Sequence, residues 1–279
     1  MLLCDAGAPR NAPVAHMHGF LSRDGLPSGE LRRIGREQLA AYDSVEVRPA
    51  QVEAASVDGD GFAVTLAGGA REAARRLLLA TGVVDDLPAV DGLAGLWGRG
   101  VFNCPYCDGW EVRDQPLAVL GADPRAMQLA VHLTRWSGDV VWCPNGPLPL
   151  DDEGRARLAA RGVRLCEEPV ARLEGGDGHL DRVVFATGAP LHRRAAFRHP
   201  PTSQRSDLPD QLGCRLLEDG SVEVSDLGQT SVPGVFAAGD MARRPSMPLP
   251  GAQVVIAAAA VAIAAVAVDQ ELAMRDFAG

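Results

Sequence analysis

The chain contains one order of predicted elements twice, and this internal repeat constrains its fold more than any other feature. In each copy, apolar segments of strand length alternate with helical segments, and a hairpin and the tripeptide Ala-Thr-Gly follow them. In the second copy we expect these elements at 117–120, 124–136, 140–143, 151–161, 163–166 and 170–185, before Ala186-Thr187-Gly188. In the first copy we expect them at 1–4, 30–42, 45–47 and 51–66, with a last strand from Arg76 into Ala80-Thr81-Gly82.

Alternating strands and helices of this kind are typical of a nucleotide-binding half built on a parallel sheet. We therefore predict the α/β class, with two Rossmann-like domains whose layers follow the order ββα. The first domain is expected to be discontinuous and to bind FAD, with residues 1–93 and 218–279. The second, an NAD(P)-type domain, is expected to be inserted at 94–217. A total of 279 residues suits two domains.

The two copies differ at their starts. Leu117 lies 26 positions before Cys143, whereas only three residues precede Cys4, which leaves the first copy 26 − 3 = 23 residues shorter. That difference corresponds to a strand, a turn and a helix, the phosphate-binding part of such a half. We expect the first domain to lack its first βα unit and the sequence to be N-terminally truncated. The alternative is a gene start assigned too late.

Composition excludes several other classes of protein. Apolar residues make up 47% of the chain, which is too many for a disordered segment. The net charge of −9, without clustered positive charge, argues against nucleic acid as a partner. The apolar run at 254–268 is too short to span a bilayer and indicates a buried helix, so no membrane association is expected. No signal sequence is visible, and six cysteines in a chain this long are not a disulfide scaffold, so we expect a cytoplasmic protein.

The strongest local signal is Cys104-Pro105-Tyr106-Cys107-Asp108-Gly109. Two thiols at this spacing can close a small disulfide loop, and their proximity lowers the pKa of one of them. Thiol–disulfide exchange also needs a group that moves the second proton, and Asp108 is placed for that task. A zinc site would need a second such pair, whereas Cys143 and Cys166 are isolated in the sequence. We therefore predict Cys104, Cys107 and Asp108 as catalytic residues and no metal site.

Two acidic residues at strand ends are candidates for binding a dinucleotide. Gly239-Asp240 follows an apolar strand, and the carboxylate of Asp240 can accept a hydrogen bond from a ribityl or ribose hydroxyl, although a plain turn at the strand end is an alternative. Asp5 ends the second strand of its copy, where an acid can hold an adenosine ribose. His16 and His18, in a Gly/Pro-rich loop, are candidate metal ligands, surface residues or neighbours of a flavin or thiol substrate.

The dinucleotide fingerprint expected after the strand at 117–120 is incomplete. Gly121 and Ala126 hold the first and last positions of the fingerprint, but Asp123 replaces its middle glycine and would repel phosphate. The stretch 144–146, after the next strand, supplies neither an acid for a ribose diol nor an arginine for a 2′-phosphate. Both features argue against binding of NAD(P)H.

Taken together, these residues resemble the thioredoxin reductase-like flavoproteins, a branch of the pyridine nucleotide-disulfide oxidoreductases, over nearly the whole chain. The motifs that carry the resemblance are Cys104-Pro-Tyr-Cys107-Asp108-Gly109, Leu79-Ala-Thr-Gly82, Thr230-Ser-Val-Pro-Gly-Val-Phe-Ala-Ala-Gly-Asp240 and Gly251-Ala-Gln253. The CPYCDGW form and the stretch from Asp5 to Phe20 look more like a subgroup of bacterial and fungal dithiol oxidases, which close disulfides in small sulfur-containing natural products.

The resemblance implies a role for each matching position. Cys107 would face the flavin, Cys104 would exchange with the substrate and Asp108 would shuttle protons. The positions that would contact FAD are Asp5, Asn11, Thr81, Gly82, Gly239, Asp240, Ala252 and Gln253. A homodimer is also implied. The chain departs from the family in two places, because the first Gly-rich loop is absent and the second is degraded.

We therefore expect an FAD-dependent thiol–disulfide oxidoreductase that cycles a CxxC disulfide, in the direction of oxygen-dependent oxidation of substrate dithiols. An NADPH-dependent thioredoxin-disulfide reductase and a flavin-free remnant without activity are the alternatives. The expected partner is a small dithiol or disulfide, or a thioredoxin-like protein.

Overall fold

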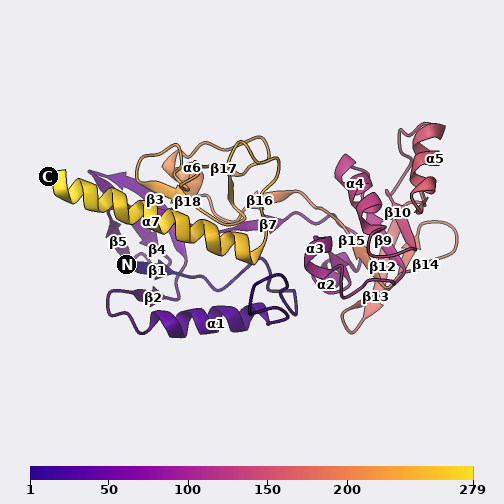
Figure 1. Cartoon of the computed structure of the whole chain (residues 1–279), viewed down its shortest axis with the longest axis horizontal. Coiled ribbons are helices and arrows are strands. Elements are labelled where there is room, and N and C mark those ends of the chain that lie inside the picture. Colours follow the sequence, from indigo (N-terminus) through magenta and orange to yellow (C-terminus); the bar gives the residue numbers. More distant parts are fainter. Residues whose placement is uncertain (279) are drawn as a thin grey trace. The chain divides into compact units, whose positions relative to one another are not determined.

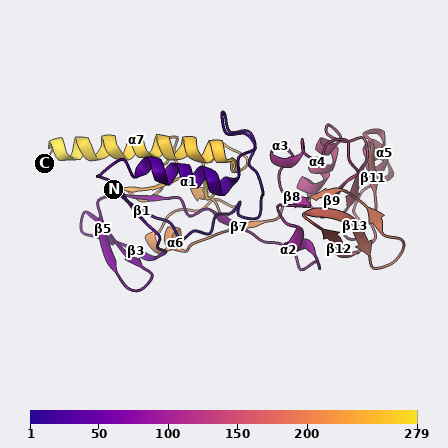
Figure 2. The ribbon, with the colours of Figure 1, turned by 90° about the horizontal axis from the view of Figure 1, so that it is seen from below.

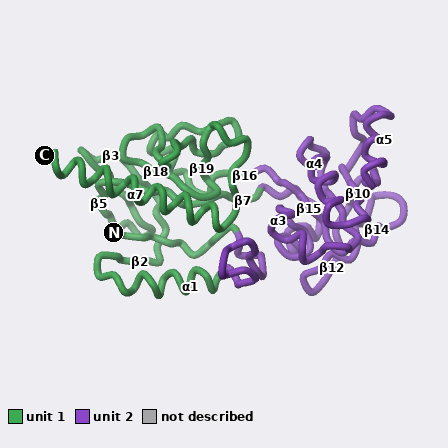
Figure 3. The backbone as a smooth tube through the Cα atoms, viewed as in Figure 1, with its two compact units in different colours: residues 1–10, 29–85, 202–279 green, residues 11–28, 86–201 purple. Residues whose placement is uncertain are grey.

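The chain divides into two compact units in the computed structural model, which describes residues 1–278 (Figure 1, Figure 3). Unit 1 is formed by residues 1–10, 29–85 and 202–279, and unit 2 by residues 11–28 and 86–201. The boundaries between the units lie at 85/86 and 201/202, whereas the expected domain boundaries lie at 93/94 and 217/218. The loop at 11–28, expected in the first domain, groups with unit 2. The cofactor preference assigned to each domain stays a prediction.

Five parallel strands form the central sheet of unit 2, in the order β11-β10-β9-β15-β8. Their bounds are β8 Val101–Phe102, β9 Leu117–Leu120, β10 Val140–Cys143, β11 Val163–Leu165 and β15 Ala195–Phe197. Every residue of β9 and β10 is buried, because layers on both faces cover these uniformly apolar strands.

The two covering layers of unit 2 differ in kind. Helices α4 (Pro124–Leu133) and α5 (Asp152–Ala160) contribute Leu129, Leu133 and Leu158 to the core on one face. The antiparallel strands β12 (Val170–Gly176), β13 (His179–Phe185) and β14 (Leu191–His192) cover the other face, with Leu173, Leu180 and Val183 packed against Ala118 and Val141. Short helices α2 (Leu93–Leu96) and α3 (Pro105–Asp108) complete the unit. The predicted ββα layering is confirmed.

Unit 1 contains several small sheets. Its parallel pairs are β1 (Leu2–Cys4) with β2 (Glu46–Arg48), β6 (Leu77–Leu79) with β18 (Val235–Ala237), and β17 (Val222–Glu223) with β19 (Ala242–Arg243). Its antiparallel sheets are β3 (Val52–Asp58) with β4 (Gly61–Leu66) and β5 (Arg71–Ala74), and β7 (Val83–Asp85) with β16 (Thr202–Gln204). Its helices are α1 (Ser28–Leu39), α6 (Leu208–Leu212) and α7 (Val254–Ala278). Figure 2 shows α1 and α7 on one side of the strands and β3 and β5 on the other.

The central strands of the two units correspond, with one difference. In unit 2, β9 pairs with both β10 and β15 and joins them into one sheet. Within the described part of unit 1, the β1–β2 and β6–β18 pairs are separate sheets, and no strand takes the place of β9 between them. Residues 1–278 therefore contain no strand equivalent to β9 in unit 1, as the comparison of the two repeats predicts.

The two Ala-Thr-Gly tripeptides do not occupy equivalent places, contrary to the expectation from the repeat. Thr81 and Gly82 follow β6, which pairs in parallel with β18. The tripeptide at 186–188 instead lies in the bend between β13 and β14, and β15 is the strand that corresponds to β6. Gly82 and Gly188 both have positive φ, at 72° and 88°, so the shared sequence reflects a turn that favours glycine in either setting.

The apolar run at 254–268 forms the first part of α7, but its expected burial is wrong. Only Ala264 and Ala267 of α7 are buried, against Phe236 of β18. A narrow two-stranded sheet contacts one stripe of a helix, which leaves Val255, Ile263 and other apolar side chains of α7 exposed. By length and composition alone, α7 could also cross a membrane, a test that core helices of soluble proteins pass as well.

Candidate functional site

Cys104 and Cys107 lie at either end of a single helical turn that follows β8. The backbone N–H groups of Cys107 and Asp108 donate to the carbonyl oxygen of Cys104, at 3.1 and 3.2 Å, and Pro105 starts the turn. Gly109 ends the turn and packs against the backbone of Pro105. A Cβ atom at this position would lie 2.3 Å from the Pro105 carbonyl oxygen. Both cysteines are half-buried, and neither forms a disulfide in the structure. The motif therefore places its two thiols side by side, as its spacing predicts.

The electrostatics of the pair favour Cys104 as the thiolate. The Cys107 thiol donates a hydrogen bond to the Cys104 sulfur, which lowers the pKa of Cys104 below its usual value. Burial opposes this shift, and the backbone N–H groups of Cys107 and Tyr106 reinforce it. A thiol with a lowered pKa is ionised more often and leaves more readily in disulfide exchange.

The carboxyl group of Asp108 has a raised pKa, whereas the other shifted carboxyl groups in the structure have lowered ones. Burial raises its pKa to about 7, and the nearby carboxylate of Glu111 contributes in the same direction, whereas His18 opposes them. A carboxyl group with a pKa near neutrality exists in both protonation states at physiological pH. Asp108 can therefore both accept and release a proton beside the thiol pair.

His18 connects the loop at 11–28 to this acidic group. Its Nε2 atom lies 3.4 Å from Oε1 of Glu111, and its Nδ1 atom lies 3.4 Å from Oδ2 of Asp24. Asp24 is held by the backbone N–H of Gly19 at 2.8 Å. Of the roles considered for His16 and His18, proximity to the thiol chemistry fits this arrangement. No group of three or more metal-ligating side chains occurs among residues 1–278.

A cavity of about 930 Å³ within unit 2 brings these side chains together. His16, His18, Asp108 and Glu111 line it, and the hairpin turn at 175–179 lines it as well. A cavity of this size accommodates a small molecule. The sequence pointed to His18 only weakly and did not point to Glu111, whose one signal is its position three residues after Asp108.

An aromatic cluster surrounds the exposed side of the motif. The Tyr106 hydroxyl lies 3.0 Å from Nε2 of His132, and the two rings pack edge-on with Trp136. Burial and the charge of Arg135 lower the pKa of His132, which favours the neutral form of its imidazole. Trp110, beyond the motif, is exposed and carries the Arg113 guanidinium 3.9 Å above its ring. The cluster fixes the orientation of Tyr106 between the two cysteines.

In unit 1, the predicted FAD ligand Asp240 is paired with an arginine that sequence reasoning missed. Arg10 Nη1 lies 2.8 Å from the Asp240 carboxylate, and its Nε atom also donates to Asp85 at 3.2 Å. All three side chains are largely buried. Gly239, with φ at 79°, leaves the approach open, because a Cβ atom there would meet nothing closer than 3.8 Å.

The other predicted FAD ligands are only partly brought together. Asp5 accepts a hydrogen bond from the N–H of Gly7 at 2.8 Å and is paired with Arg36. Thr81 donates to the sulfur of Met241 at 3.4 Å. Asn11 belongs to unit 2, where its carbonyl oxygen accepts from the N–H of Val14 at 3.2 Å.

Ala252 and Gln253 precede the first turn of α7, which contains no acidic residue that would neutralise the positive end of the helix. With Asp240 and the open Gly239, they remain the residues predicted to contact the hydroxyl-bearing and pyrimidine parts of FAD. Among the described residues of unit 1, no Gly-rich loop supplies contacts to its diphosphate.

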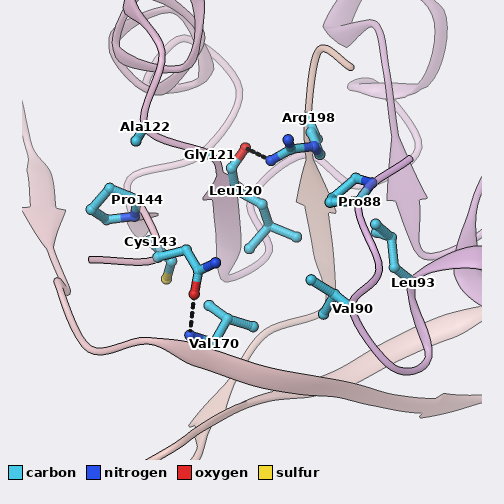
Figure 4. Close-up of a pocket in the computed structure, with 11 residues that line it drawn as sticks. Pro88, Val90, Leu93, Leu120, Gly121, Ala122, Cys143, Pro144, Val170 and Arg198 are labelled. Atoms are coloured by element: carbon cyan, nitrogen blue, oxygen red, sulfur yellow. Dashed lines mark hydrogen bonds between the residues drawn. The ribbon is translucent and has the colours of Figure 1, made fainter. Parts of the chain in front are cut away.

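The degraded fingerprint of unit 2 has a specific structure. Asp123 caps α4, and its Oδ1 atom accepts the N–H of Ala126 at 3.1 Å. Pro124 takes the first helical position, so one amide donor is missing there. Beside it lies a cavity of about 140 Å³ lined by Gly121, Cys143 and Arg198 among others (Figure 4). Asp123 thus takes the place where a helix N-terminus binds phosphate.

Comparisons with known proteins agree with this architecture. A family model described as pyridine nucleotide-disulphide oxidoreductase matches residues 26–265. A probable thioredoxin reductase of Arthroderma benhamiae is 34% identical over 86% of this chain and 67% of its own length. The crystal structure of HlmI is similar with 40% identity and a TM-score of 0.91, over 99% of this chain and 86% of that one.

A putative thioredoxin reductase TrxB of Bacillus anthracis has 28% identity and a TM-score of 0.90, over 99% of this chain and 91% of its own. The residues matched by the family model include most of both units and the whole CxxC motif. The chain therefore belongs to the pyridine nucleotide-disulphide oxidoreductase family, as a thioredoxin reductase-like flavoprotein oxidoreductase.

Proposed function

We propose that this protein is an FAD-dependent dithiol oxidase, which takes electrons from substrate dithiols through Cys104 and Cys107 and passes them to oxygen. The observation that carries the proposal is the cap on α4. A diphosphate needs free N–H donors at that helix end, and Asp123 offers it a carboxylate that already accepts the Ala126 N–H. NAD(P)H therefore lacks its anchor in unit 2, and the substrate dithiol must supply the electrons.

The Cys104–Cys107 disulfide is the oxidant that meets the substrate. One substrate thiolate attacks the Cys104 sulfur, which breaks the Cys104–Cys107 bond and forms a mixed disulfide. The second substrate thiolate then attacks the first substrate sulfur in that mixed disulfide, which closes the substrate disulfide and releases Cys104 as a thiolate. The lowered pKa of Cys104 favours this second step.

The protons of the substrate thiols need an acceptor near the cysteines. Asp108, with a pKa of about 7, accepts a proton at its carboxylate and returns it in the next half of the cycle. Glu111 raises the pKa of Asp108 and His18 lowers it, so together they set the pH at which Asp108 exchanges its proton.

FAD, when bound, supplies the two-electron chemistry that reoxidises the dithiol and reduces oxygen to hydrogen peroxide. Asp240, Gly239, Ala252 and Gln253 are the residues of unit 1 that would hold it, with Asp5 at the adenosine end. In this role Arg10 keeps the charge of Asp240 balanced, so that an anionic cofactor is not repelled.

The names of relatives favour a second function, an NADPH-dependent thioredoxin reductase with a thioredoxin-like partner. The two functions differ in electron source. The FAD-loaded full chain is assayed in parallel for oxygen consumption with dithiothreitol and for reduction of a disulfide dye with NADPH. Oxygen uptake with the dithiol and no NADPH-dependent reduction support the oxidase. Reduction of the dye by NADPH at ordinary turnover, without oxygen uptake, overturns it.

A further inference from the structure

Cys143 and Cys166, which are isolated in the sequence, are neighbours in the sheet of unit 2. Trp142 of β10 is in register with Leu165, the last residue of β11, so the next residues along the chain, Cys143 and Cys166, follow that pair. The Cys166 N–H donates to the Trp142 carbonyl oxygen at 2.9 Å, which extends the parallel ladder to this point. In-register residues of adjacent strands point to the same face, about 4.8 Å apart.

The two thiols contact one another directly. The Cys143 thiol is hydrogen-bonded to the sulfur of Cys166, and the Cys166 thiol donates to Oε2 of Glu168 at 3.1 Å. A separation of about 4.8 Å between backbones lies within the Cα–Cα range of about 4.4–6.8 Å that disulfides span. The spacing of the strands therefore satisfies the Cα–Cα separation that a disulfide requires.

Cys143 and Cys166 differ in how accessible they are to solvent. Cys143 is fully buried and lines the cavity of about 140 Å³ beside Pro144 (Figure 4). Cys166 is half-buried, and its hydrogen-bond acceptor Glu168 is exposed. An oxidant from solution therefore meets Cys166 first and reaches Cys143 only through it.

We propose that Cys143 and Cys166 are a second redox-active dithiol, separate from Cys104 and Cys107, which closes into a disulfide when a small disulfide such as oxidised glutathione is present. The Cys166 thiolate attacks the glutathione disulfide, forms a mixed disulfide and releases one glutathione thiolate, which is protonated by solvent. The Cys143 thiolate then attacks the Cys166 sulfur and releases the second glutathione. Two protein thiols are oxidised, and one glutathione disulfide is reduced to two thiols.

The chemistry of the pair sets its rate. Burial and the hydrogen bond to Glu168 raise the pKa of Cys166 to about 11, and burial raises the pKa of Cys143 further. Because the thiolate is the reactive form, closure is slow at pH 7 and accelerates about tenfold per pH unit up to pH 9. The resulting bond would tie the carboxyl ends of β10 and β11 together at the edge of the cavity.

Peptide mapping of the full chain tests the proposal. In a Cys104→Ala/Cys107→Ala variant the catalytic pair cannot exchange, and trypsin separates the two cysteines by cutting after Arg155, Arg157, Arg161 and Arg164. The protein is incubated with oxidised glutathione at pH 8, quenched with acid, alkylated in denaturant and digested. We expect one linked pair of peptides that contains Cys143 and Cys166. Separate alkylation of both cysteines, or a lasting glutathione adduct on Cys166, overturns the proposal.

Two further variants in the same background sharpen the result. Cys214→Ala removes a different buried cysteine and is expected to leave the link intact. Glu168→Gln removes the charge that holds the proton on Cys166, so the link is expected to form several-fold faster. A closure rate that is independent of pH and unchanged in Glu168→Gln contradicts the thiolate mechanism.

Discussion

Oδ1 of Asp123 accepts the backbone N–H of Ala126 at 3.1 Å, so a carboxylate of the chain itself occupies the amino end of α4. This hydrogen bond has two consequences, because it both stabilises the helix and excludes a phosphate.

The first prediction separates these two consequences. Asp123→Ala is expected to destabilise unit 2 by about 1 kcal/mol, because it removes an N-cap, and Asp123→Asn is expected to retain most of that stability. Chemical denaturation measures both. Asp151→Ala removes the equivalent cap of α5, where Oδ1 accepts the N–H of Gly154 at 2.8 Å, and should cost a similar amount. Only the substitutions at Asp123 should strengthen binding of NADP⁺, and equal effects at both caps would contradict the assignment.

The second prediction concerns Asp108 as the group that moves protons. Asp108→Asn is expected to lower the rate of dithiol oxidation by about 10²–10⁴-fold, because an amide cannot exchange a proton. The pH–rate profile of the unsubstituted protein should bend near pH 7, the pKa of Asp108, and this bend should be absent from the variant. A residual profile with the same bend would assign the titration to another group.

A third prediction follows from the neighbours of Asp108, which act in opposite directions. Glu111→Gln removes a negative charge and should move the bend in the profile to lower pH, whereas His18→Asn removes the opposing charge and should move it to higher pH. Asp24→Asn, on the far side of His18, is the matched control and should have a smaller effect. Shifts of the same sign at Glu111 and His18 would refute this electrostatic account.

The stability of the folded protein should depend on pH through the same carboxyl group. Its pKa is raised on folding, so the folded state binds the proton more tightly than the unfolded chain. Its contribution to stability is therefore largest below about pH 4 and is lost as the pH rises to about 7. Asp108→Asn should accordingly gain stability relative to the parent as the pH rises from 4 to 8 in urea denaturation. A constant difference over that range would exclude Asp108 as the cause.

The fifth prediction tests the ion pairs of Arg10. Arg10→Ala leaves two largely buried carboxylates, those of Asp85 and Asp240, without their cation, and should destabilise unit 1 by about 3 kcal/mol. Arg33→Ala removes an exposed arginine that also has two acidic partners, Glu30 and Glu37, and should cost less than about 1 kcal/mol. Similar losses for the two variants would show that burial does not strengthen the Arg10 pairs.

Much of the architecture is predictable from local patterns. The alternation of apolar strands with helices predicts the ββα units, and the spacing of Cys104 and Cys107 predicts their proximity, because both features depend on residues close in sequence. The match between the repeats also predicts which strand position is missing between β1 and β6.

Features that depend on tertiary contacts were beyond the sequence. The pKa of Asp108 follows from burial and from the approach of Glu111 and His18. His18 is far from Glu111 in the sequence, so their contact arises only in the fold. Cys143 and Cys166 become neighbours only through the register of β10 and β11. The burial of α7 was wrongly predicted, because an apolar composition does not show how much of the helix surface packs against the sheet.

Anaerobic stopped-flow spectroscopy of the FAD-loaded protein tests the central claim most directly. The oxidised enzyme is mixed with a dithiol in one experiment and with NADPH in a second. The flavin absorbance is followed in each case. We expect the dithiol to bleach the flavin within the turnover time and NADPH to leave it oxidised. Rapid bleaching by NADPH, with no reduction by the dithiol, would contradict the assignment of this protein as a dithiol oxidase.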